Sequence, residues 1–363
     1  MKSVFDFDKN LTVNTMEPHD LIWRNAKDKV FGLYGTDAKN EPGFYRLTVK
    51  ERDYIRPIND GEAWLGEQSS GIQIRFETNS AQIFVRVKLR SKFDMTNMTQ
   101  IGQCGLDLYV YDERLGGYGL LEVARYQFDA TEYELSLGRF DTHPQKMRKY
   151  IINLPLYMAV DDMEIGLDNN AVVRPNPFKN KTRIGIYGTS IVHGCSSSRP
   201  GLSPSNVLSR RFDEEVLNFG FSGCAMMEKE MGEILAKRKL DLLIVDVEPN
   251  AGIDRRMGDN AVPFLEAYLA KNPTVPVILY SRVLFNLDLF DEYRVELAAY
   301  YRDFLRELAK QYRKKGYKVF FEDGSKIFKG NFAEYTTDGI HPNDIGMRAL
   351  TDSYERAIKR ARR

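Results

Sequence analysis

The sequence predicts two fold classes in succession: an all-β sandwich, followed by an α/β domain built on a parallel sheet. Before residue 172, apolar and polar residues alternate with period two, which is typical of half-buried strands. After residue 181, apolar runs of strand length alternate with longer stretches at helical spacing, a βα repeat that predicts a parallel sheet with helices on both faces. Residues 173–181 carry two prolines among polar residues, which favours a linker.

Length and composition agree with two domains. The 363 residues are 43% hydrophobic, which is enough for one large core or two moderate ones. We expect an accessory domain over residues 1–175 and a second domain over 181–363. Because 52 Lys and Arg stand against 51 Asp and Glu, the net charge of +1 indicates neither a nucleic acid nor an anionic membrane as partner. The oligomeric state stays open.

In the first part, strands are expected where the alternation is clearest. Residues 72–76 and 83–89 place an apolar side chain at every second position, with a turn at 79–80 between them. Further strand-like runs are at 106–111, 119–128 and 149–158. Many short strands separated by Gly, Asn and Asp turns are typical of a β-sandwich of the jelly-roll kind.

In the second part, five strands alternate with five helices. The strands are expected near residues 182–187, 215–220, 241–247, 276–281 and 317–321, and the helices near 203–213, 226–239, 261–271, 288–315 and 344–361. Ligands of such sheets bind beyond the carboxyl ends of the strands, so residues that follow a strand are candidates for a site.

The first candidate is Ser190, which follows the strand near 182–187. Gly188 permits a sharp exit from that strand and places Ser190 at the start of the next helix. A hydroxyl there lies among free backbone N–H groups, which can hold an oxyanion. The alternative is that Ser190 is only a helix cap.

Near the C-terminus, Asp338 precedes His341, one of only four histidines, by three residues. A serine hydroxyl becomes a good nucleophile when a histidine takes its proton, and the histidine works best when a carboxylate fixes its tautomer. Ser190, Asp338 and His341 therefore supply a complete set for acyl transfer. An Asp-x-x-His segment is also common in capped turns and surface pairs, so this alternative stays open.

Two further candidates follow the second and third strands. Gly223 has no Cβ, so its backbone N–H can lie close to a substrate. Glu248-Pro249-Asn250 ends the apolar strand near 241–247 and supplies a side-chain amide and a carboxylate. Each of these residues also fits an ordinary strand-to-helix turn.

Together these four blocks resemble those of the SGNH hydrolases, also called the GDSL esterase/lipase superfamily. The resemblance implies that Ser190 is the nucleophile, His341 the general base and Asp338 its orienting group. It also implies an oxyanion hole that consists of the backbone N–H groups of Ser190 and Gly223 and the side chain of Asn250. A flavodoxin-like order of the five strands follows from the same resemblance, and no cofactor is expected.

The chain departs from the superfamily pattern at two places. Thr189 stands where the superfamily name has Asp, and Glu248 stands where many members have a glycine. Neither change removes a catalytic group, but Glu248 adds a carboxylate where the glycine leaves room, so it is a possible substrate-binding residue.

A subgroup resembles the chain more closely. Residues 193–201 and the Gly-Leu-Asp-Leu-Tyr run at 105–109 are similar to bacterial two-domain SGNH esterases, in which a β-rich domain with a Gly-x-Asp-Leu-Tyr motif precedes the hydrolase. This resemblance implies an esterase that removes a short acyl group, in particular acetyl, from a carbohydrate or a similar polar alcohol. The alternatives are an acyltransferase with the same triad and a carbohydrate-binding protein with an inactive hydrolase domain.

The sequence allows two roles for Arg199. Its guanidinium either contacts a substrate oxygen or anchors its loop by pairing with a carboxylate such as Glu248. Cys195 and Cys224 both lie near proposed active-site loops, but three cysteines do not form an even framework, so free thiols are expected. No His/Cys cluster has the spacing of metal ligands, so no metal site is expected.

The sequence has no run of 18 apolar residues, which argues against a transmembrane helix. The first eight residues carry acidic side chains where a secretory signal needs a basic segment and then an apolar one. The visible N-terminus therefore predicts a cytoplasmic protein, and a secreted or periplasmic location applies if a signal peptide has been removed.

Overall fold

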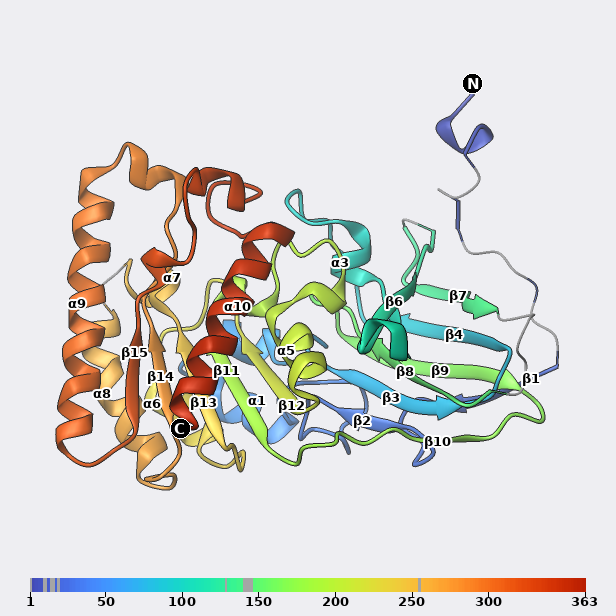
Figure 1. Cartoon of the computed structure of the whole chain (residues 1–363), viewed down its shortest axis with the longest axis horizontal. Coiled ribbons are helices and arrows are strands. Elements are labelled where there is room, and N and C mark those ends of the chain that lie inside the picture. Colours follow the sequence, from blue (N-terminus) through green and yellow to red (C-terminus); the bar gives the residue numbers. More distant parts are fainter. Residues whose placement is uncertain are drawn as a thin grey trace.

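The structure is a computed structural model of the chain, and it describes residues 2–8, 12–13, 17, 20–127, 129–139, 146–253 and 256–363. Residue 128, the last of one predicted strand run, lies outside the described residues. Figure 1 shows the β-rich N-terminal part beside the α/β part, in which helices flank a sheet.

The N-terminal part is a sandwich of two antiparallel sheets, as the sequence predicts. One sheet has the order β1 (Leu21–Asn25), β9 (Val160–Asp168), β4 (Gln82–Leu89) and β7 (Glu132–Arg139). The other has the order β10 (Val173–Pro175), β3 (Gln73–Thr78), β8 (Arg148–Asn153), β5 (Asp107–Asp112) and β6 (Gly117–Val123), with β2 (Gly32–Tyr34) beside β3. Alternate residues of β4 and β3, such as Val85 and Ile74, are fully buried in one core between the sheets.

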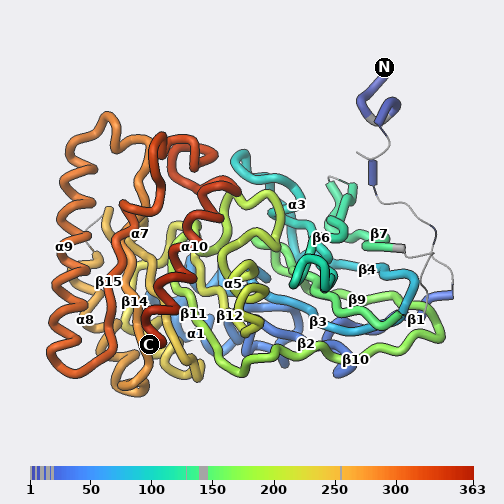
Figure 2. The backbone as a smooth tube through the Cα atoms, viewed as in Figure 1, coloured from blue at the N-terminus to red at the C-terminus, as the bar shows by residue number. Residues whose placement is uncertain are grey.

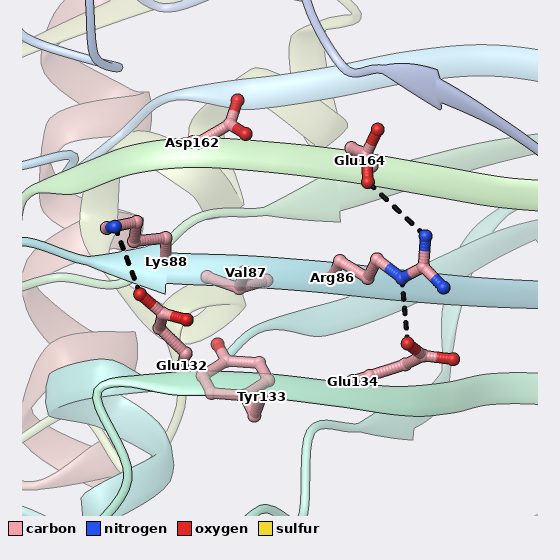
Figure 3. Close-up of a pocket in the computed structure, with 8 residues that line it drawn as sticks. All are labelled: Arg86, Val87, Lys88, Glu132, Tyr133, Glu134, Asp162 and Glu164. Carbon is pink, nitrogen blue, oxygen red and sulfur yellow. Dashed lines mark hydrogen bonds and ion pairs between the residues drawn. The ribbon is translucent and has the colours of Figure 1, made fainter.

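The other face of the β4, β7 and β9 sheet is charged and open to solvent. Figure 3 shows Arg86 between Glu134 and Glu164, and Lys88 beside Glu132. The N···O distances are 2.7 Å for Arg86 to Glu134 and 3.1 Å for Lys88 to Glu132. Exposed pairs of this kind add little stability, so this face is a solvated surface on which ion pairs cross between neighbouring strands.

The C-terminal part has a five-stranded parallel sheet in the order β12 (Glu215–Gly220), β11 (Arg183–Gly188), β13 (Leu242–Asp246), β14 (Val277–Tyr280) and β15 (Val319–Glu322). This 2-1-3-4-5 order is the flavodoxin-like one and confirms the prediction. One core cluster joins the sheet to α6 (Lys229–Leu235), α8 (Arg256–Leu269) and α9 (Glu292–Lys314). Another joins it to α5 (Pro204–Phe212) and α10 (Asp344–Ala361), so helices cover both faces.

Two short helices of the N-terminal part also pack on the core that contains α6, α8 and α9. Ile55 of α1 (Val49–Ile55) and Leu65 of α2 (Asp60–Leu65) lie in the same buried cluster as Phe219 of β12. Figure 1 shows α1 beside the parallel sheet. The buried Arg46 next to them donates to Gly220 O at 2.5 Å and to Leu65 O at 2.6 Å. The two parts are therefore joined by apolar packing and buried hydrogen bonds as well as by the linker.

The division into domains at 1–175 and 181–363 remains a proposal. Strand β10 ends at Pro175 and β11 begins at Arg183, which agrees with a linker there. The helices at 49–65 nevertheless pack with the C-terminal core. By position in the sequence they belong to the N-terminal part, but by their apolar contacts they belong to the C-terminal part. Within the described part of the chain, no helix is long and apolar enough to cross a membrane.

Candidate active site

Three of the predicted site residues follow neighbouring strands of the parallel sheet. Ser190 follows β11, Gly223 follows β12 and Asn250 follows β13, and β11 lies between the other two. The register pairs Gly188 with both Gly220 and Asp246, so the three strands end at the same level. The sheet therefore brings these loops to one edge, where ligands of open α/β sheets bind.

Ser190 is the first residue of a one-turn helix, α4 (Ser190–His193). The cap of this helix is Thr189, whose side-chain oxygen accepts a hydrogen bond from Ile191 N. The alternative that Ser190 is only a cap is therefore wrong. A Cβ at Gly188 would lie 2.4 Å from Val192 and 2.5 Å from Asp246 O, so glycine is needed for the close approach of the strand exit.

The side chains of Ser190, His341 and Asp338 form one chain of contacts. Ser190 Oγ lies 2.9 Å from His341 Nε2, and His341 Nδ1 lies 2.7 Å from Asp338 Oδ2. The other oxygen, Asp338 Oδ1, accepts the backbone N–H groups of Ile340 and His341, so a tight turn presents both residues to the serine. This is the arrangement of a nucleophile, a base and an orienting carboxylate.

The surroundings shift the pKa values of Asp338 and His341 in the directions that favour an ion pair between a carboxylate and an imidazolium. Burial alone would raise the pKa of Asp338, but donors from His341 and from the Asn97 side chain lower it to about 2. Burial alone would lower the pKa of His341, but Cys195 and Asp338 beside the ring raise it to about 9. The carboxylate is therefore ionised at neutral pH, and an imidazolium at His341 is stabilised.

Within the part of the chain that the structure describes, the proposed oxyanion donors have no other partner. Among the hydrogen bonds of the described residues, none has the backbone N–H of Ser190 or Gly223 as donor. The Asn250 Oδ1 atom is buried without a partner, and its Nδ2 donates to no described group. Gly223 has φ +73°, and a Cβ there would meet nothing within 4 Å. These donors are therefore free to bind a developing negative charge, although no hydrogen bond joins Gly223 or Asn250 to Ser190.

Glu248, the first residue of α7 (Glu248–Ala251), is buried and engaged by Arg282. Its carboxylate accepts from Arg282 N at 2.8 Å and lies 3.8 Å from Arg282 Nε. Burial raises the pKa of Glu248 to about 7, although Arg282 opposes the shift. The carboxylate that replaces the usual glycine therefore fixes the segment after β14 in place.

Arg199 anchors its loop by pairing with a carboxylate, which is one of its two predicted roles, but the carboxylate is Asp107 of the Gly-x-Asp-Leu-Tyr motif and not Glu248. The Arg199 guanidinium donates to Asp107 Oδ2 at 3.3 Å and to the Tyr109 hydroxyl. Asp107 is fully buried and also accepts from Gly201 N at 2.6 Å and from Asn153 Nδ2 at 2.6 Å. The motif thus holds the 199–201 loop of the α/β part against the sandwich.

The structure adds Asn97, which the sequence did not single out. Its Nδ2 donates to Asp338 Oδ2 at 2.7 Å and lies 3.4 Å from His341 Nδ1 and 3.6 Å from Cys195 Sγ. A single Asn in a polar loop carries no periodic signal, so sequence reasoning had no means to find it. Cys104, Cys195 and Cys224 are free thiols, and no cluster of metal-ligating side chains occurs within the described ranges.

Comparisons with known families and structures agree with this geometry. Residues 181–359 match the model of the GDSL-like Lipase/Acylhydrolase family, and residues 21–173 match the GxDLY model, the N-terminus of Esterase_SGNH_hydro-type. No curated protein matches the chain.

Among solved structures, a protein described as a GDSL-like lipase from Bacteroides ovatus is 28% identical, with a TM-score of 0.84 over 94% of this chain and 98% of that one. A salicylyl-acyltransferase from a tetracycline biosynthetic pathway is 19% identical with a TM-score of 0.75, over the same shares of the two chains. A family two carbohydrate esterase from Cellvibrio japonicus is 11% identical with a TM-score of 0.63, again over 94% and 98%.

Proposed function

Because the chain is an esterase that belongs to the GDSL-like lipase/acylhydrolase family, with a GxDLY-type N-terminal part, we propose that it removes a short acyl group, acetyl, from a carbohydrate or a similar polar alcohol. The observation that carries the proposal is the chain of contacts at 2.9 Å and 2.7 Å from Ser190 through His341 to Asp338. It supplies each group that a covalent serine mechanism needs.

In the first half of the proposed reaction, Ser190 Oγ attacks the ester carbonyl carbon while His341 Nε2 takes the hydroxyl proton. Asp338 holds the Nδ1–H side of the ring and stabilises the imidazolium. The carbonyl oxygen becomes an oxyanion, which the Ser190 and Gly223 amides and the Asn250 side chain bind. The ester C–O bond then breaks, and the departing alcohol takes the proton from His341, which leaves an acyl-serine.

In the second half, water replaces the alcohol. His341 takes a proton from water as the water oxygen attacks the acyl-serine, and the same donors bind the second oxyanion. The bond to Ser190 Oγ breaks, Oγ regains its proton from His341, and the carboxylic acid leaves. An acceptor alcohol in place of water would make the same site an acyltransferase.

The sandwich side of the site supports a sugar as the alcohol part. Asn59, the cap of α2, donates to Cys224 O at 2.7 Å, so α2 lies against the loop that carries Gly223. On this helix the Trp64 side chain is half exposed, and its ring lies 6.0 Å from the ring of Phe93. The half-exposed Trp64 ring, backed by the partly buried Phe93, suits the apolar face of a sugar ring and leaves its hydroxyls in water.

The first test is covalent labelling with a fluorophosphonate, followed by intact-mass analysis and peptide mapping. One adduct on Ser190 is expected, and Ser190→Ala should remain folded, take up no probe and lose several orders of magnitude in ester turnover. A carbohydrate-binding protein with an inactive hydrolase domain would not react with the probe.

The second test concerns the substrate. Acetylated sugars and an aryl acetate are compared, with product analysis in the presence and absence of an added acceptor alcohol to separate hydrolysis from transfer. Trp64→Ala should lose more activity on acetylated sugars than on the aryl acetate, because only the sugar reaches the ring. Tyr111→Ala removes another exposed aromatic ring, on β5, and serves as control. Equal losses on both substrates would argue against the sugar platform.

A further inference from the structure

One loop of the β-rich part reaches the catalytic carboxylate. Residues 90–99 connect β4 to α3 (Gln100–Cys104), and Asn97 on this loop donates to Asp338 Oδ2 at 2.7 Å, across 241 positions of sequence. Figure 2 shows this teal segment before α3 beside the red segment that precedes α10. The contact therefore joins the two parts of the molecule at the catalytic pair.

Asn97 completes the set of donors around Asp338. The Oδ1 atom of Asp338 accepts two backbone N–H groups of its own turn, from Ile340 and His341. The Oδ2 atom accepts His341 Nδ1 and Asn97 Nδ2, each at 2.7 Å. Asn97 is thus the single donor in this set from outside the catalytic loop, and it binds the oxygen that orients the histidine.

The α/β part in turn holds the Asn97 loop. The Asn97 carbonyl oxygen accepts from Ser196 Oγ at 2.9 Å, and the Thr99 hydroxyl donates to Ser198 O. On the sandwich side, Met95 N donates to Gln103 Oε1 at 2.9 Å. Because the loop is tied at both sides, the amide of Asn97 is presented to Asp338 in a fixed position.

We propose that Asn97 is a positioning residue for the Asp338–His341 pair, so that the β-rich part supplies a component of the catalytic centre. This inference rests on the proposed serine esterase function. The Asn97 amide holds the carboxylate in the orientation that His341 needs. Its N–H group also partly offsets the negative charge on Asp338 Oδ2, which limits how strongly Asp338 stabilises the imidazolium of His341.

The direction of the pH effect follows from the groups around His341. They are Asp338 on its own loop, Ser190 and Cys195 from the segment after β11, and Asn97 from the sandwich. Removal of the Asn97 donor leaves more negative charge on Oδ2, so His341 should hold its proton to higher pH. A second carboxylate in place of Asn97 should act in the same direction and more strongly.

The test measures the rate of labelling by a fluorophosphonate against pH, because this probe reports the reactivity of Ser190 without a known substrate. Asn97→Ala should label about ten- to hundredfold more slowly at neutral pH, the cost of one hydrogen bond to a charged group. The inflection in its curve of labelling rate against pH should lie at higher pH than that of the unchanged protein. Asn97→Asp has almost the same shape and should show a larger shift. Gln100→Ala, at the start of α3, removes hydrogen bonds to Asp94 of the loop and to Tyr126 but leaves the contact of Asn97 with Asp338, and it should label like the unchanged protein.

The outcomes separate the two proposals. If the unchanged protein does not react with the probe, the serine esterase proposal fails, whatever the Asn97 variants do. If it reacts and Asn97→Ala has the same labelling rate and inflection, the positioning role is wrong. A lower melting temperature with an unchanged inflection would reveal a merely structural contact and would also overturn it. If Asn97→Ala does not fold, the isosteric Asn97→Asp decides: an inflection at higher pH supports the positioning role, and an unchanged inflection overturns it.

Discussion

At the scale of single residues, the proposed mechanism makes His341 the group that determines how the site responds to pH, because a base must be a neutral imidazole. The pKa of His341 is raised from 6.5 to about 9 by Cys195 and Asp338, against the effect of burial. The reaction rate should therefore rise with pH through about 9. The same shift stabilises the folded state below pH 6.5, and this contribution is lost as the pH rises through about 9.

The rate is measured on an aryl acetate, with correction for spontaneous hydrolysis. Cys195→Ala removes one of the groups that raise the pKa of His341, so its inflection should lie at lower pH than that of the unchanged protein. A rate that is already constant from about pH 6 to pH 10 would contradict the assignment of His341 as the base.

The Asn250 side chain makes no hydrogen bond to the described part of the fold. Its Oδ1 has no partner and its Nδ2 donates to no described group, so Asn250→Ala should leave the melting temperature nearly unchanged. Turnover should fall by about 10² to 10³, because in the proposed oxyanion hole the side chain binds charge that develops in the transition state. Both quantities are measured on the same preparation.

Asn272→Ala is the matched control for Asn250→Ala. The Asn272 side chain donates to Ala236 O at 3.0 Å and to Tyr268 O at 3.2 Å, so its removal should lower the melting temperature and spare turnover. Normal turnover with a lower melting temperature in Asn250→Ala itself would remove Asn250 from the oxyanion hole.

At the scale of elements, the Gly-x-Asp-Leu-Tyr strand β5 and the 199–201 loop form a buried polar joint. Asp107→Ala would leave Arg199, Gly201 N and Asn153 without their shared acceptor. We expect a loss of about 3 to 5 kcal/mol in the free energy of unfolding, measured with urea. Arg86→Ala breaks exposed pairs on the sandwich face and should cost about 0 to 1 kcal/mol. Similar losses for the two variants would contradict this role of the motif.

The same scale shows what the sequence can predict. The five strands and five helices that were predicted in the α/β part lie within a few residues of their expected positions, because each is long enough to be recognised, whereas the one-turn helices α4 and α7 were not predicted. The run predicted as a strand over 149–158 ends at Asn153, before Pro155, which has no N–H for the ladder. Helices α1 and α2 were not predicted, since their apolar residues meet a core that the chain forms much later.

The candidate site divides in a similar way. Asp338 and His341 lie on one short segment and follow a recognisable pattern, so their partnership could be predicted. Arg199 was expected near a carboxylate, but Asp107 rather than Glu248 fills that place, since pairing across the two parts depends on how they dock. The role of Asn97 depends on the same docking.

At the scale of the whole molecule, the two parts should unfold together. The C-terminal core includes Ile55 and Leu65 of the N-terminal part, so neither part can unfold without exposing apolar surface of the other. The chain has two tryptophans, Trp23 on β1 and Trp64 at the junction. In Trp64→Phe, fluorescence therefore reports the sandwich through Trp23, while far-UV circular dichroism is dominated by the helices.

These two signals should give one coincident transition in urea. If Trp23 fluorescence changes at a clearly lower urea concentration than the circular dichroism, the sandwich unfolds by itself and the shared core does not couple the parts. Residues 181–363 produced alone should be poorly soluble for the same reason, because the surface that covers Phe219 is missing.

The position of α1 and α2 in the chain has a consequence for synthesis on the ribosome. Their apolar residues leave the ribosome with the N-terminal part, but α6, the helix that packs on α1, ends at Leu235, about 180 residues later. At a translation rate of about 5 to 20 residues per second, about 10 to 40 s pass before the residues that cover these side chains have been synthesised. During that interval the nascent N-terminal part exposes the apolar surface of α1 and α2. The growing chain is therefore a natural client for a chaperone that binds near the ribosomal exit.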